Sequence, residues 1–180
     1  TLLLDIAPSE LTPDEAAKGL TLESSAVRNR IVSQLFEASK KLKPAPFMLA
    51  KNAGLISIGN FADDISKLKD CDLVIEAVVE NLEIKHKLFA EVEKNRKPGA
   101  VIASNTSGIP IKSIAEPFSD DFKKHFVGVH FFTPPRYMKL VEVIPTGWTD
   151  GEMACKLSGF LDRRLGKGVV PAKDRPNFIA

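Results

Sequence analysis

Apolar residues recur along the chain in two alternating patterns, which predict strands and helices in turn. Residues 72–79 are nearly all apolar, as expected of a strand covered on both faces of a sheet. The stretch 82–95 places its apolar residues on one helical face: Ile84, Leu88, Phe89 and Val92. Residues 22–42 also have helical spacing, and Pro44 and Pro46 end that pattern.

Shorter apolar runs predict the remaining elements. We expect strands at residues 2–6, 55–58, 100–103, 126–132, 140–144 and 168–171. Further helices are expected at 63–68, after Pro110, and at 149–165, where Thr149 or Asp150 is the N-cap. Because strand and helix alternate through most of the chain, we expect an α/β fold with a doubly wound, mostly parallel sheet.

Composition narrows the class of protein without identifying it. With 180 residues and 44% apolar content, the chain is able to bury one core, or one core with an appendage. The net charge of +2 gives no indication of a nucleic-acid partner, and the apolar runs are too short for a membrane span. Cys71 and Cys155 lie far apart, without metal-ligand spacing, and we interpret them as reduced, buried thiols of an intracellular protein.

The two ends of the chain suggest a fragment. The sequence opens directly on an apolar strand, and residues 174–180 end in the middle of what we interpret as a longer motif. We therefore expect the chain to be an internal piece of a longer polypeptide.

Polar residues follow several of the predicted strands. Asp5, Glu80, Ser107 and His130 all lie at or just beyond a predicted strand end. Right-handed crossovers bring the carboxyl ends of parallel strands to one edge of a sheet, where ligands bind. These four residues therefore form a candidate site.

Asp5 is a candidate for binding a dinucleotide. A carboxylate at the end of a strand is able to accept both hydroxyl groups of an adenosine ribose, and it repels the extra phosphate of NADP. Alternatively, Asp5 caps the turn before Pro8. The glycine-rich turn that usually accompanies such a carboxylate is absent from this sequence, and residues 166–168 precede a predicted strand rather than a helix.

Three further positions each have a functional and a structural interpretation. Glu80 and Lys85 either line a cofactor crevice near ribose and nicotinamide, or belong to a helix start and a solvated surface respectively. The four hydrogen-bonding residues 104–107 either form a turn or bring the Ser107 hydroxyl to a substrate oxygen.

His130 and Glu142 lie in two neighbouring apolar strands. Two unpaired titratable groups in core strands would be costly, so we expect them to pair. A carboxylate on one imidazole nitrogen fixes the tautomer and leaves the other nitrogen as a general base. A purely structural pair remains the alternative.

Several motifs resemble one enzyme family, in one order and spacing. They are VIEAVVEN at 74–81, SNTS at 104–107, GVHFF at 128–132, MKLVE at 138–142, Gly166-Lys167, and residues 174–179. This series resembles the L-3-hydroxyacyl-CoA dehydrogenases of fatty-acid β-oxidation. The segment 10–52, with Arg28-Asn29-Arg30, is similar to the branch found in multifunctional proteins that add an enoyl-CoA hydratase module.

The resemblance implies a Rossmann-like fold and a role for each candidate. His130 would be the catalytic base and Glu142 its partner, while Ser107 would bind the substrate oxygen near the nicotinamide. Asp5 would hold the adenosine ribose of NAD, and Glu80 and Lys85 would line the NAD site. The parent would oxidise (3S)-3-hydroxyacyl-CoA to 3-oxoacyl-CoA with NAD.

The chain departs from the family pattern in four places. The first strand with its glycine-rich turn and the C-terminal helical domain are absent, so residues 1–180 would be a single partial dinucleotide-binding domain, truncated at both ends, with a helical insert at 10–52. Thr133 replaces an asparagine that helps bind substrate, and its hydroxyl replaces one amide hydrogen bond but not two. Asn177 stands where glycine is usual.

Two other functions compete with the dehydrogenase. One is a catalytically silent domain of the same fold that binds NAD or CoA, which Thr133 and the missing turn favour. The other is a related hydroxyacid or hydroxybutyryl-CoA oxidoreductase with a different acyl pocket. For the parent we expect an acyl-CoA substrate, no metal, a homo-oligomer or a fused hydratase module, and a cytoplasmic location, with the mitochondrial matrix as the alternative.

Overall fold

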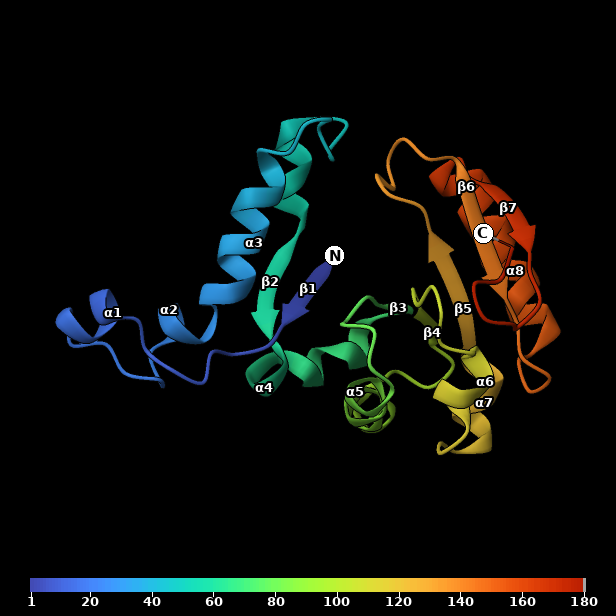
Figure 1. The fold of residues 1–180 in the computed structure, drawn as a ribbon, viewed down its shortest axis with the longest axis horizontal. Coiled ribbons are helices and arrows are strands. Elements are labelled where there is room, and N and C mark those ends of the chain that lie inside the picture. The colour runs from blue at the N-terminus through green and yellow to red at the C-terminus, as the bar shows by residue number, and fades with distance from the viewer. Residues whose placement is uncertain (180) are drawn as a thin grey trace. The chain divides into compact units, whose positions relative to one another are not determined.

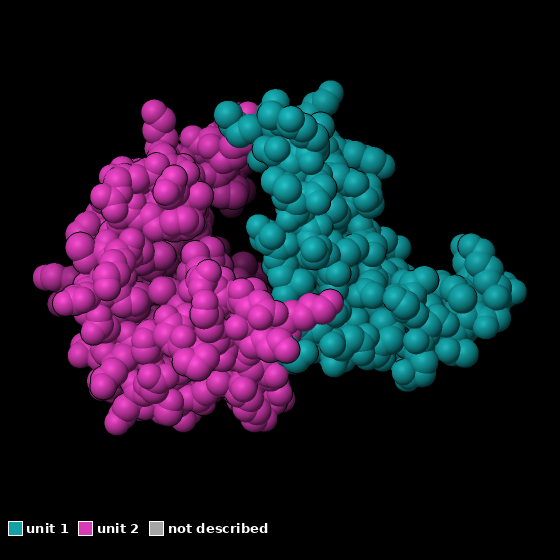
Figure 2. All heavy atoms as spheres, turned by 180° about the vertical axis from the view of Figure 1, so that it is seen from behind, with its two compact units in different colours: residues 1–66 teal, residues 67–180 magenta. Residues whose placement is uncertain are grey.

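A computed structural model describes residues 1–179 and divides the chain into two compact units, 1–66 and 67–180 (Figure 2). Each has its own parallel strand pairing: a two-stranded sheet in the first unit and a five-stranded sheet in the second (Figure 1). The mixed α/β class and the mostly parallel sheet confirm the predicted fold class.

The first unit is built around two parallel strands. β1 (Leu2–Asp5) pairs with β2 (Ser57–Asn60), and the register sets Asp5 opposite Asn60. The elements between and after them are α1 (Pro13–Ala17), α2 (Ser25–Arg28), α3 (Arg30–Lys40), the 3-10 helix η1 (Ala50–Leu55) and α4 (Phe61–Asp64). α3 packs against both strands (Figure 1). A second 3-10 helix, η2 (Ile65–Asp70), crosses the boundary between the units.

The helix predicted at 22–42 is wrong in its continuity. It is divided into α2 and α3 at Asn29, whose side-chain amide donates to the Ser25 carbonyl at 3.2 Å. A side chain that bonds to nearby backbone competes with the helical pattern. The apolar periodicity carries no sign of such a bond. Three short helices, α1 to α3, nevertheless lie within the segment 10–52.

The second unit contains a sheet in the order β3-β4-β5-β6-β7. The strands are β3 (Leu73–Glu76), β4 (Val101–Ser104), β5 (Phe126–Phe131), β6 (Leu140–Ile144) and β7 (Gly168–Pro171), and only the β5–β6 pair is antiparallel. The helices are α5 (Leu82–Asn95), α6 (Ile111–Ala115), α7 (Asp120–His125) and α8 (Gly151–Leu165). α7 was not predicted, although Ser119 before two aspartates is a recognisable helix start, and Ser119 does cap the Phe122 amide.

The predicted strand 72–79 is too long. β3 ends at Glu76, and Ile75 and Val79 are 44% and 63% exposed. These exposed side chains show that the apolar run is not covered on both faces, and among the described residues β3 is an edge strand that pairs only with β4. The predicted burial of both thiols is also wrong, because Cys155 is exposed and Cys71 is half-buried.

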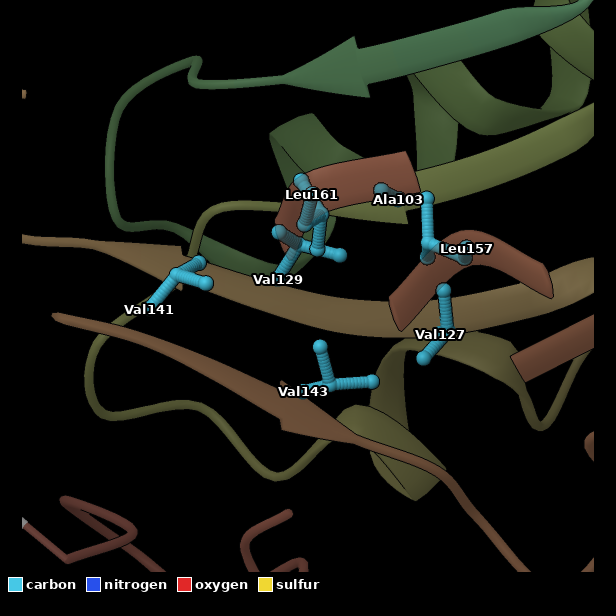
Figure 3. Close-up of a cluster of buried hydrophobic side chains, with 7 residues drawn as sticks. All are labelled: Ala103, Val127, Val129, Val141, Val143, Leu157 and Leu161. Carbon is cyan, nitrogen blue, oxygen red and sulfur yellow. The ribbon is translucent and has the colours of Figure 1, made fainter. Parts of the chain in front are cut away.

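Packing against the sheet holds the second unit together. One face buries alternate residues of β5 and β6 against α8 (Figure 3): Ala103, Val127, Val129, Val141, Val143, Leu157 and Leu161. Each valine or leucine among these contributes about 1.5–3 kcal/mol when fully buried. The other face carries Phe126, whose ring lies 5.1 Å from Phe89 and 5.2 Å from Phe122 between centroids. His130 and Gly128 share the parity of Phe126 and therefore this second face.

Two glycines are required by the backbone or by close packing. Gly166 ends α8 with a φ of 66°, in the left-handed region that favours glycine. Gly128 leaves room for Ile111 of α6, since a Cβ there would lie 2.6 Å from the Ile111 Cδ1. This close approach brings the start of α6 down onto β5. Among residues 1–179, no helix has the length and apolar character needed to cross a membrane.

Candidate functional site

His130 and Glu142 are paired, as predicted. They face each other in the antiparallel register of β5 and β6, and Nδ1 of His130 lies 2.6 Å from Oε2 of Glu142. The side chains are 13% and 1% exposed, respectively. Burying a carboxylate this deeply is costly unless its oxygens accept hydrogen bonds. In this pairing Nδ1 carries a proton and donates it to the carboxylate in a hydrogen bond, which leaves Nε2 as the basic nitrogen.

The second carboxylate oxygen of Glu142 also has a donor. The Ile179 amide donates to Oε1 at 2.9 Å. Aromatic rings surround the imidazole, because Phe132 lies 4.7 Å and Phe178 5.8 Å from it between ring centroids. The ring is thus held in place by one polar and two apolar neighbours. Sequence reasoning missed Ile179, since an amide leaves no trace in residue type.

The loop after β4 is tied directly to the strand that carries His130. The Asn105 side chain accepts from the Phe131 amide at 2.9 Å, and the Asn105 amide donates to the Glu76 carbonyl at 2.7 Å. Ser107 follows in the same loop and is exposed. Because β4 and β5 are neighbours in the sheet, Ser107 and His130 belong to the carboxyl ends of adjacent strands. Of the motif 104–107 we singled out Ser107 alone, and the contacts of Asn105 were not predicted.

Glu80 organises that loop. Its Oε1 accepts amide hydrogens from Ser107 at 3.2 Å, Gly108 at 2.9 Å and Ile109 at 3.4 Å, and also the Thr106 hydroxyl. Burial works against ionisation, but the Thr106 hydroxyl, the Gly108 amide and the Lys85 charge outweigh it and hold the pKa of Glu80 at about 2. Glu80 is therefore a carboxylate that shapes the Ser107 loop from beneath.

Lys85 lies inside the protein. Its side chain is 1% exposed, so the surface alternative is wrong. Its amine donates to Glu76 at 2.8 Å and lies 3.3 Å from Oε2 of Glu80. The Ser104 hydroxyl donates to the other Glu76 oxygen at 2.6 Å. α5 delivers Lys85 to this position because Asn81 caps the helix by accepting from the Ile84 amide.

Thr133 is the second residue of the loop 132–139 between the two strands of the His130–Glu142 pair, and the loop is exposed from Thr133 onward. Lys167, only 8% exposed, holds this loop by donating to the carbonyls of Pro135 and of Met138, the latter at 2.8 Å. A buried lysine whose partners are carbonyls fixes the position of the backbone. In the sequence, the feature that could have indicated this role is the place of Lys167 directly after Gly166, which ends a helix.

Asp5 belongs to the other unit. It ends β1, and its Oδ1 accepts from the Ile6 amide at 2.7 Å, a contact of the local-turn kind. The remaining oxygen is compatible in chemistry with a ribose hydroxyl. Among the described residues, no group of three or more His, Cys, Asp or Glu is arranged to hold a metal ion.

Comparisons with known proteins agree on one family. The profile described as 3-hydroxyacyl-CoA dehydrogenase, NAD binding domain, matches residues 16–175, which include parts of both units. A probable 3-hydroxyacyl-CoA dehydrogenase of Bacillus subtilis is 54% identical over 179 residues, covering 99% of this chain and 23% of that protein. A putative fatty acid oxidation complex trifunctional enzyme of Rickettsia felis is 45% identical, covering 84% of this chain and 21% of its own length.

A solved structure extends the agreement to the fold. The crystal structure of Mycobacterium tuberculosis FadB2 superimposes with a TM-score of 0.67 at 38% identity, covering 86% of this chain and 53% of that one. The chain thus spans less than a quarter of the two relatives described above and about half of this structure. The resemblance drawn from the motifs is confirmed. The chain belongs to the 3-hydroxyacyl-CoA dehydrogenase family, as part of its NAD-binding domain.

Proposed function

We propose that the protein containing this chain oxidises (3S)-3-hydroxyacyl-CoA to 3-oxoacyl-CoA with NAD in fatty-acid β-oxidation. The observation that carries this proposal is the buried His130–Glu142 pair, 2.6 Å apart, at the edge of a sheet that belongs to an NAD-binding family. A base at that edge meets the requirement of alcohol oxidation, which removes a proton from oxygen and a hydride from carbon.

In this proposal Nε2 of His130 takes the hydroxyl proton. NAD, when bound, accepts the hydride from C3, and the C3–O bond becomes a carbonyl. Glu142 stabilises the imidazolium that forms, because its charge lies against Nδ1. Ser107 binds the substrate oxygen, and Thr133 contributes one further hydrogen bond to the substrate.

For the cofactor, we propose that Asp5 binds the adenosine ribose and that Glu80 and Lys85 form the wall of the nicotinamide crevice. The half-exposed carboxylate of Asp5 suits a ribose hydroxyl. Lys85 is buried, so it contributes through Glu80 rather than by reaching a ligand. The contacts of Lys85 with Glu76 and Glu80 support this role, since Glu80 in turn binds the amides of the Ser107 loop.

We propose that both units form one partial dinucleotide-binding domain in which residues 10–52 are an insert. The family profile supports this, because its match extends from residue 16 to residue 175. We further propose that the parent adds a C-terminal helical domain, forms a homo-oligomer or carries a fused enoyl-CoA hydratase module, and works in the cytoplasm, with the mitochondrial matrix as the alternative. The name of the Rickettsia relative supports a multifunctional parent.

A second candidate is a silent domain that binds NAD or CoA. Thr133 favours it, because a hydroxyl offers fewer hydrogen bonds to a substrate carbonyl than an amide. A 3-hydroxybutyryl-CoA dehydrogenase would keep the same pair and differ in its acyl pocket.

The deciding experiment measures NADH formation from (3S)-3-hydroxybutyryl-CoA and from a longer homologue, with this chain and with the protein extended at both ends. The His130→Gln variant of the extended protein is assayed beside its wild type, and we expect activity only in the extended protein. We expect His130→Gln to lower turnover by about 10²–10⁴-fold, the usual contribution of a general base. The matched control is His125→Gln, which removes a surface imidazole bonded to the Asp121 carbonyl. Normal turnover in His130→Gln would remove His130 from the mechanism. No turnover by this chain or by the extended protein, with NAD or CoA still bound, would favour the silent domain.

A further inference from the structure

Residues 172–179, here called the strap, run from the end of β7 back to the His130–Glu142 pair. The Ala172 amide donates to the Val143 carbonyl at 2.9 Å, and the Ile179 amide donates to Glu142 at 2.9 Å. The strap therefore crosses the same face of the sheet that carries the imidazole.

Asp174 fastens the strap to α6. Its two carboxylate oxygens accept from successive amides at the start of that helix, Oδ1 from Ile111 at 2.7 Å and Oδ2 from Lys112 at 2.8 Å. Pro110, in the N-cap position, supplies no side-chain cap of its own. A residue more than sixty positions away thus satisfies the first amides of α6, and the helix and the strap become one body.

The far end of the strap completes the environment of Glu142. That carboxylate is buried, and one of its oxygens is committed to His130. An unsatisfied buried carboxylate oxygen would be costly, so the position of the Ile179 amide affects how Glu142 is held. The strap also places the Phe178 ring beside the imidazole.

The backbone between these two attachments is strained. Asn177 and Phe178 have φ values of 64° and 48°, in the left-handed region that non-glycine residues rarely adopt. Such a conformation persists only where its surroundings impose it. The contacts of Asp174 at one end and of Ile179 at the other are such constraints, and the Phe178 amide also donates to the Arg175 carbonyl at 2.9 Å within the strap.

We propose that Asp174 is a positioning residue for the His130–Glu142 pair. By fixing the strap on α6, Asp174 sets the Ile179 amide against Glu142 and so keeps His130 in the tautomer with the proton on Nδ1. α6 follows directly after the Ser107 loop, so the same contact ties the loop and the pair to a common support. The catalytic consequence rests on the proposed function, whereas the structural consequence does not.

The test compares two aspartates that cap helices in the same unit. Asp150 caps α8 by accepting from the Met153 amide at 2.8 Å, without any contact to the strap. The variants are Asp174→Asn and Asp174→Ala, with Asp150→Asn and Asp150→Ala as controls, in the purified protein labelled with ¹⁵N-histidine. The His130 resonances are identified by their loss in His130→Gln, and the ring-nitrogen shifts report the fraction of each tautomer.

We expect one tautomer in the wild type and in both Asp150 variants. The second tautomer should appear in Asp174→Asn, which keeps one of the two acceptor oxygens, and more strongly in Asp174→Ala. Hydrogen exchange at Ile179 should accelerate in the same order. If Asp174→Ala does not fold, the milder Asp174→Asn decides. Unchanged His130 spectra in a folded Asp174 variant, or equal changes in the Asp150 controls, would overturn the proposal.

Activity provides a separate readout. We expect kcat to fall in Asp174→Asn, by less than the ~10²–10⁴-fold expected on removing the base itself, with KM nearly unchanged. Loss through KM alone would contradict a role in positioning the base. A tautomer change in a protein without dehydrogenase activity would uphold the positioning role and reject the proposed function.

Discussion

Two buried carboxylates of the second unit stand beside a nitrogen partner, and they differ in what that partner is able to do. Glu76 faces Lys85, and Glu142 faces His130; both carboxylate side chains are 1% exposed. The lysine is 1% exposed, charged, and bonded to neighbours on several sides. The imidazole is 13% exposed and keeps one nitrogen for another partner. The Glu76–Lys85 pair is therefore suited to holding the surrounding structure in place, and the Glu142–His130 pair to proton transfer.

The supporting pair should give the largest change in stability when it is broken. Lys85→Met retains the volume of the side chain but leaves Glu76 and Glu80 without their cation. Removing one member of a buried pair costs about 3–5 kcal/mol, which urea unfolding would measure. Lys94→Met is the matched control on the same helix, because its partner Glu91 is at the surface and such pairs contribute about 0–1 kcal/mol. Equal losses in the two variants would contradict the distinction.

The chemical pair should respond in activity instead. Glu142→Gln removes the charge beside the imidazolium, and hydrogen bonds to charged groups contribute about 1.5–3 kcal/mol. Turnover should therefore fall by about 10- to 100-fold, with an altered pH–rate profile. Glu93→Gln, which changes a surface carboxylate that accepts from Ser119, serves as the control. An unchanged pH–rate profile in Glu142→Gln would mean that the pair is structural.

Asp5 is a third kind of carboxylate, because its partner is the backbone amide of the next residue, Ile6. If Asp5 binds ribose, Asp5→Asn should weaken NAD binding by about 1 kcal/mol, or roughly fivefold, as measured by calorimetry. CoA binding should be unaffected, and Asp14→Asn in the same unit should change neither. Equal weakening of NAD and CoA would indicate a folding defect.

Glu80 should give the smallest effect, one that is present at neutral pH and disappears in acid. Its pKa is lowered from 4.5 to about 2 in the folded protein, so the folded state releases the proton more readily than the unfolded state. The resulting stabilisation is complete above about pH 4.5 and is lost as the pH falls through about 2. The side chain is 42% exposed, which reduces the contribution through screening. Glu80→Gln should flatten the stability curve in this range, while Glu83→Gln should leave it unchanged.

Local patterns predicted most of the second unit. The strands at 140–144 and 168–171 and the helix at 82–95 have the expected bounds, because the apolar pattern within each segment is enough to define it. The break at Asn29 and the early end of β3 escaped prediction, since they depend on a side-chain bond and on which strands become neighbours.

The candidate site was predictable where residue type carries the chemistry. His130 and Glu142 are conspicuous in apolar strands, and cost alone argues that they pair. The support of Glu80 for the Ser107 loop and the contact between Ile179 and Glu142 are different, because both join a carboxylate to amides 27 to 37 positions away. Only the folded chain reveals such partners.

The hairpin formed by β5 and β6 also sets rules for insertion and deletion. Both members of the pair are fixed by one ladder, and a slip of one residue in β6 would turn Glu142 to the opposite face of the sheet. The loop 132–139 between them lies outside that ladder. The ladder therefore does not fix the length of this loop, and a change of length there leaves His130 and Glu142 in register. The limit on such changes comes instead from Lys167, which donates to the carbonyls of Pro135 and Met138.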